Sequence, residues 1–227
     1  MRQSEINMGY YIIEDVIKPS FISFSCDRLI SSSDCICNMH PDLRGCFWLG
    51  YKDEKKAYKQ KLGLSDEEYV KMSECVVDLF HKGILGANDR FNSLDAALEF
   101  RETYLNKCEN MHIIGLFTTD KYINVLLEQF ENPEYFKKVA PDTGRRDIKK
   151  KFIGCEIIGY DMGLDEPHSY LCNSLDKELI GHGLLTGKWG LIQNGFEQVE
   201  EFAKLIQGKG EPVDWIPVML YEYYNAV

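Results

Sequence analysis

Apolar and polar positions follow two rhythms along this chain, and the shorter rhythm predicts its strands. Stretches rich in aromatic and β-branched residues lie at 9–16 (GYYIIEDV), 20–26 (SFISFSC), 46–51 (CFWLGY) and 111–117 (MHIIGLF). Two more lie at 152–163 (FIGCEIIGYDMG) and 211–224 (EPVDWIPVMLYEYY). In the last of these, Pro217 predicts an edge position or a bend, because proline cannot donate to a sheet ladder.

The longer rhythm predicts helices, several of them with recognisable ends. Ser65 and Glu68 have the spacing of a capping box, and an amphipathic helix is expected from there to Gly83. A second helix is expected after a cap at Asn92 or Ser93. Further helical patterns cover 119–131, a short segment after Pro133, 168–181 (HSYLCNSLDKELIG) and 195–210, where Gly208 closes the helix.

Strands and helices are interleaved without a strict βαβ order, which predicts an α+β fold with a mixed or antiparallel sheet and helices packed on it. A chain of 227 residues is long enough for one hydrophobic core, so we expect a single domain, 1–227. The polar stretch 141–151 is basic and contains glycine and proline. An arrangement in which this loop joins an N-terminal lobe (1–140) to a C-terminal lobe (152–227) remains open.

Charge is distributed unevenly along the chain, and its overall sign argues against some classes of partner. The net charge is −10, yet residues 137–151 hold seven basic side chains against two acidic ones. From residue 152 onward, twelve acidic side chains face four basic ones. An acidic surface is repelled by nucleic acid and by anionic membranes, so we expect neither as a direct partner.

The sequence also predicts a cellular compartment. No apolar run approaches the roughly 18 residues that a membrane-spanning helix needs. The first residues (MRQSEINMGYYIIEDV) lack the basic-then-apolar order of a secretory signal. A cytoplasmic protein is therefore expected, with its eight cysteines mostly reduced.

One candidate for catalysis is a thiol and an imidazole four residues apart. Cys172 and His168 would share a helix face, and Asp161 or Asp165 is a candidate to orient the imidazole. This pair keeps a thiol-dependent hydrolase or transferase open as an alternative. Cys172 nevertheless sits in an apolar run (YLCNSL), where a structural core thiol is the simpler interpretation.

A second candidate is a metal site in the loop from Cys35 to Cys46. Cys35, Cys37, His40 and Cys46 offer the soft and imidazole ligands that zinc prefers, which keeps a zinc-stabilised adaptor open. Only one residue separates Cys35 from Cys37, whereas two residues usually separate paired zinc-binding cysteines. The sequence contains no phosphate-binding glycine motif, because Trp189 follows the Gly-Lys of GHGLLTGKWG where a P-loop needs Ser or Thr. We therefore expect no cofactor, no metal and no catalytic residue.

Acidic residues interleaved with aromatic ones predict a surface for a basic protein partner. Carboxylates speed the encounter with such a partner, and desolvated aromatic rings provide anchors. A solvated acidic face over a tyrosine-rich core is the competing interpretation. The expected contacts are Asp161, Asp165, Glu166, Tyr170, Glu211, Asp214, Trp215 and Glu222.

The last third of the chain resembles a known class of proteins. GCEIIGYDMG, HSYLCNSLDKEL, the helix GFEQVEEFAKLIQ and GEPVDWIPVMLYEY are similar to the C-terminal region of small bacterial immunity proteins, over 154–223. Such proteins are encoded beside polymorphic toxins and toxins of contact-dependent growth inhibition. The resemblance implies a non-enzymatic toxin inhibitor that binds the C-terminal domain of a cognate toxin, often a basic nuclease. It does not say which toxin.

Overall fold

The structure, a computed structural model, describes residues 4–41, 52–86, 88–129, 139–141, 147–161 and 166–225. The strands are β1 (Glu5–Glu14), β2 (Val16–Ile17), β3 (Arg28–Leu29), β4 (Asn38–His40), β5 (Met111–Thr119), β6 (Ile148–Asp161), β7 (Glu166–Ser169) and β8 (Ile216–Asn225). The helices are α2 (Lys52–Leu62), α3 (Asp66–His81), α4 (Leu94–Tyr104), α5 (Asp120–Gln129), the 3₁₀ turn η1 (Tyr170–Asn173), α6 (Asp176–Gly181) and α7 (Phe196–Leu205).

One six-stranded sheet organises the fold. Its strand order is β4-β1-β5-β8-β6-β7, and every neighbouring pair is antiparallel. The α+β prediction, with helices packed on the sheet, is therefore confirmed. The sheet also crosses the boundary between the two lobes that the sequence left open, because β5 of the first lobe pairs with β8 of the second.

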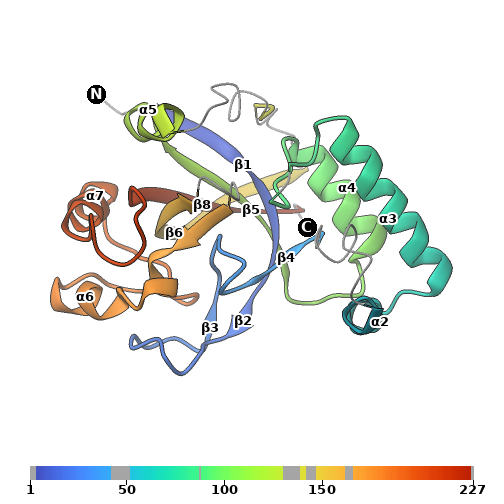
Figure 1. Cartoon of the computed structure of the whole chain (residues 1–227), viewed down its shortest axis with the longest axis horizontal. Coiled ribbons are helices and arrows are strands. Elements are labelled where there is room, and N and C mark those ends of the chain that lie inside the picture. The colour runs from blue at the N-terminus through green and yellow to red at the C-terminus, as the bar shows by residue number, and fades with distance from the viewer. Residues whose placement is uncertain are drawn as a thin grey trace.

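Each face of the sheet buries a separate apolar cluster, as the period-two pattern of strands requires. In β1, Tyr10 and Ile12 face a cluster that includes α3 and α4. Tyr11 and Ile13 face the opposite cluster, which includes α5, α6 and α7. Figure 1 shows α3 and α4 on one side of the molecule and α6 and α7 on the other. None of the described helices is long and apolar enough to cross a membrane.

The helix ends follow the local chemistry that predicted them. Ser65 caps α3 by accepting from the backbone N–H of Glu68, and the Glu68 side chain accepts from the N–H of Ser65, so the capping box is complete. Ser93, and not Asn92, caps α4 by accepting from the N–H of Ala96. Asn92 instead donates its side-chain amide to the carbonyl of Gly83.

The segment 168–181 is not one continuous helix. Its first residues belong to β7, where His168 pairs with Gly159 of β6. Ser169 then accepts from the N–H of Leu171 and starts η1, and Ser174 ends it with a left-handed φ of 57°. Only α6, which begins at Asp176, matches the predicted α-helix. The residues before it belong to β7 and η1 instead.

Three other segments differ from expectation. The stretch 20–26 buries Ile22 and Phe24 without joining a sheet ladder. The basic loop 141–151 ends early, since β6 begins at Ile148. The last strand, β8, lies centrally between β5 and β6, and it tolerates Pro217 because its pairing with β5 begins only at Met219. The expected strand at 46–51 and the helix after Pro133 lie outside the described residues.

Candidate functional site

The expected acidic contacts begin at the sheet edge. Asp161 is the last residue of β6 and pairs in register with Glu166, the first residue of β7. The strand pairing therefore brings the backbones of these two positions together. Asp165 lies outside the described residues.

Neither expected aromatic anchor is available at the surface. Tyr170 and Trp215 are each only 1% exposed. The indole N–H of Trp215 donates to the carbonyl of Lys209 at 2.9 Å, and burial raises the pKa of Tyr170 well above its usual value. The two rings are core residues, which corrects the expectation, because aromatic residues beside acids in sequence can still point to the opposite side of the backbone.

Two of the expected acids lie in the loop that follows α7. Asp214 is exposed, and the Glu211 side chain is partly exposed, with Oε2 lying 3.3 Å from Nδ1 of His168. Gln207 fixes this loop against the end of α7, since its side chain accepts from the N–H of Trp215 and donates to the carbonyl of the same residue. The loop and the helix therefore form one surface.

The eighth expected contact, Glu222, is engaged inside the protein. Its Oε1 lies 2.7 Å from Nδ1 of His112, and Nε2 of the same imidazole lies 3.4 Å from Asp15. The hydrogen bond from His112 lowers the pKa of Glu222. With both ring nitrogens facing carboxylates, His112 has no free nitrogen to act as a general base.

Arg28 and Trp189 complete this polar cluster on the same face of the sheet. Arg28 pairs with Asp15, and the indole N–H of Trp189 points at Asp15 from 3.4 Å. Burial raises the pKa of Asp15, but the hydrogen bond from Arg28 and the nearby charges outweigh burial, so the pKa is lowered overall. The cluster joins Arg28 of β3, His112 of β5 and Glu222 of β8 to Asp15, which lies between β1 and β2, and we assign it a structural role.

The structure does not bring Cys172 and His168 into a catalytic pair. Cys172 Sγ contacts the hydroxyl of Ser33 at 3.3 Å, whereas His168 faces Glu211. Burial raises the pKa of the Cys172 thiol to about 12. An activated thiol needs the opposite shift, so Cys172 is a poor nucleophile.

The loop cysteines and His40 are also directed to different places. Cys37 is buried, and its thiol donates to the carbonyl of Leu29 at 3.6 Å. His40 bonds the hydroxyl of Tyr58 at 2.7 Å, in the other half of the fold. Cys35 is exposed, and Cys46 lies outside the described residues. Within the described ranges, no group of three metal-ligating side chains converges.

Sequence reasoning missed one buried polar network altogether. Glu156, in the middle of β6, accepts from the hydroxyl of Ser31 at 2.5 Å and from the backbone N–H and hydroxyl of Ser32 at 2.9 and 2.8 Å. Burial raises the pKa of Glu156, and the serine donors partly oppose this effect. An acidic residue within the apolar run FIGCEIIGYD was the available signal. The network anchors the loop 31–33 to the sheet.

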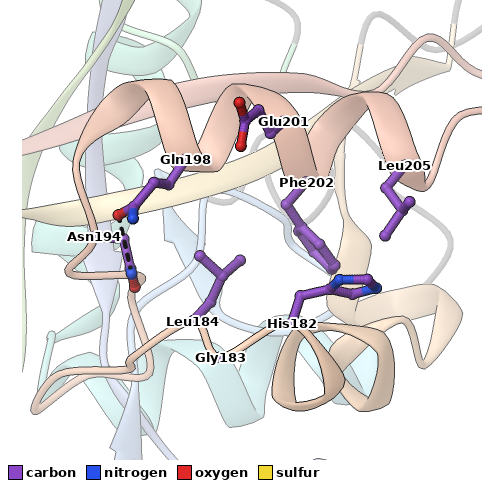
Figure 2. A pocket seen from close by; sticks show the side chains of 8 residues that line it. All are labelled: His182, Gly183, Leu184, Asn194, Gln198, Glu201, Phe202 and Leu205. Atoms are coloured by element: carbon purple, nitrogen blue, oxygen red, sulfur yellow. Dashed lines mark hydrogen bonds between the residues drawn. The ribbon is translucent and has the colours of Figure 1, made fainter.

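A cavity of about 270 Å³ opens between α7 and the segment after α6. Figure 2 shows Gln198, Glu201, Phe202 and Leu205 on one side and His182 and Leu184 on the other. The rings of His182 and Phe202 lie 6.1 Å apart.

Exposed apolar side chains border this cavity. Leu205, which lines it, is 44% exposed, and Leu185, the chain neighbour of the lining residue Leu184, is 67% exposed. Exposed apolar side chains beside a hollow are a feature of many contact surfaces.

The three glutamates of α7 differ in whether their carboxylates have hydrogen-bond partners within the described part of the chain. Glu200 accepts from the hydroxyl of Tyr122 at 2.9 Å and from Lys121 at 3.4 Å. Glu197 and Glu201 are exposed, and neither has a hydrogen bond or an ion pair with another described residue. Two carboxylates of this helix are therefore available to a partner.

No protein-family model, curated protein or solved structure matches this chain.

Proposed function

We propose that this chain is a cytoplasmic immunity protein, which binds and neutralises the C-terminal domain of a cognate toxin without performing catalysis itself. The observation that carries the proposal is the surface around α7. There, the available carboxylate of Glu201 lines a cavity with an exposed apolar border, and the available carboxylate of Glu197 lies four positions earlier on the same helix. The resemblance to immunity proteins over 154–223 includes this surface.

The charge of the surface points to a basic toxin, such as a nuclease. A nuclease holds nucleic-acid phosphates with lysine and arginine side chains, and carboxylates of an inhibitor can occupy the positions of those phosphates. Glu211 and Asp214 extend the acidic surface along the loop that follows α7. Binding there would block the toxin by covering its substrate channel.

The buried positions of Tyr170 and Trp215 change how the partner is anchored. Since both rings belong to the core, the apolar contribution must come from other side chains. Leu185 and Leu205 fill this role in the proposal, because they expose large apolar area next to the carboxylates. Desolvated apolar contacts supply affinity, while the charges around them mainly accelerate association.

The proposal is tested by measuring, with titration calorimetry, the affinity of the chain for its toxin domain. We expect that domain to be encoded immediately upstream. The test variant combines Glu197→Lys with Glu201→Lys. The control combines Glu74→Lys with Glu102→Lys, exposed positions of α3 and α4 on the other side of the molecule. We expect the test variant to bind at least about tenfold more weakly and the control to bind like the wild type. Equal affinities for both variants would remove the basis for the proposal.

A further inference from the structure

We propose that the cavity between α7 and the segment after α6 is the binding site for a single arginine side chain of the partner. This inference rests on the proposed function and specifies how the partner is recognised. The cavity of about 270 Å³ lies below the roughly 300–1,000 Å³ that small-molecule sites usually offer. Its size therefore favours one side chain over a metabolite or cofactor.

The lining suits a side chain with an apolar stem and a charged end. Phe202, Leu184 and Leu205 provide apolar walls, and Glu201 provides a carboxylate without a partner among the described residues. An aliphatic anchor would leave this carboxylate facing an apolar group, and the desolvation of the carboxylate would weaken binding. A basic side chain packs its aliphatic stem against the apolar walls and pairs its cationic end with the Glu201 carboxylate.

Arginine fits this lining better than lysine for reasons of shape. The guanidinium group is planar, pairs with a carboxylate through two parallel N–H donors and stacks on ring faces. Glu201 offers the carboxylate, and the rings of Phe202 and His182 line the cavity from opposite sides, with their centroids 6.1 Å apart. The compact ammonium group of lysine uses neither the bidentate geometry nor the stacking surface.

One side of the cavity is already held in place before a partner arrives. The Asn194 side chain accepts from the N–H of Leu185 at 2.6 Å and donates to Gln198 at 3.1 Å, a bond that is drawn in Figure 2. These bonds join α7 to the segment that carries Leu184 and Leu185. A preorganised wall reduces the ordering cost of binding.

The site can be probed without any toxin. The probe is N-acetyl-arginine N-methylamide, with N-acetyl-lysine N-methylamide as its comparison, titrated into the full chain labelled with ¹⁵N. We expect saturable shifts of the Gly183, Leu184 and Leu205 amide signals with the arginine probe, at millimolar affinity. Glu201→Gln should weaken this binding about tenfold, and Glu74→Gln, at an exposed position of α3 away from the cavity, should leave it unchanged.

The outcomes separate the inference from the proposed function. The absence of shifts at the cavity, equal shifts with the lysine probe, or equal losses in the two variants would each overturn the arginine site. If the arginine probe binds as expected while the toxin domain does not bind the chain, the site stands and the immunity proposal fails. Well-dispersed spectra of each variant establish that it is folded.

Discussion

His112 Nδ1 lies 2.7 Å from Glu222 Oε1, a contact that joins the central strands β5 and β8 across 110 positions of sequence. Because this hydrogen bond lowers the pKa of Glu222, the ionised form of Glu222 stabilises the fold. Its contribution is fully present above the pKa that Glu222 has in the unfolded chain. It disappears as the pH falls through the lower pKa of the folded state.

We therefore expect Glu222→Gln to lower the free energy of unfolding by about 1 kcal/mol at neutral pH and by less in acid. Urea unfolding at several pH values measures this difference. His112→Gln provides the second arm of a double-mutant cycle. Additive losses from the two substitutions would show that the contact contributes no coupling energy.

The serine anchor of Glu156 gives a second prediction about stability. Glu156→Ala leaves the buried N–H of Ser32 without its acceptor, so we expect a loss of about 3 kcal/mol. Glu156→Gln keeps a carbonyl acceptor and removes the burial of a charge, so a loss below about 1 kcal/mol is expected. Urea denaturation compares the two variants, and similar losses would argue against an anchoring role for the hydrogen bonds.

The raised pKa of Glu156 also predicts the direction of a pH effect. A carboxyl whose pKa is higher in the folded than in the unfolded state favours folding in its protonated form. Its contribution to stability therefore decreases as the pH rises from the unfolded pKa through the folded one. The wild type should lose this contribution with rising pH, whereas Glu156→Gln should not, and parallel pH profiles of the two proteins would contradict the assignment.

The thiols offer a prediction that separates this account from a thiol enzyme. The pKa of Cys172 is raised to about 12 by burial, so iodoacetamide at neutral pH should leave it unmodified in the native protein. Cys35 is exposed and serves as an internal control that should react. Peptide mass spectrometry after brief labelling measures both sites. Labelling of Cys172 as fast as Cys35 would instead support a thiol-dependent hydrolase or transferase.

The features of the fold that could be predicted from the sequence are those set by residues close together in the chain. Ser65 and Glu68 are three residues apart, so their capping box could be predicted without knowing what α3 packs against. The segment 168–181 could not be assigned in the same way, because the pairing of His168 with Gly159 is a tertiary contact that overrides helical spacing.

The candidate site was predictable only in its chemical character. The acidity of α7 is visible in the sequence, but the cavity depends on the approach of His182 to Phe202 across twenty positions. Aromatic residues next to acids misled the prediction at Tyr170 and Trp215, since adjacency in sequence does not say which side chain faces the core. The sequence pattern around Glu222 predicts a surface acid, because its partner His112 is remote in sequence.

The most direct test of the central claim is protection in living cells. The upstream toxin domain is induced in bacteria that also produce this chain, its Glu197→Lys, Glu201→Lys variant or the Glu74→Lys, Glu102→Lys control, and colony-forming units are counted. The account predicts that the wild type and the control restore growth, while the variant with the reversed charges on α7 does not. Protection by that variant at equal protein levels, or no protection by the wild type, would contradict it.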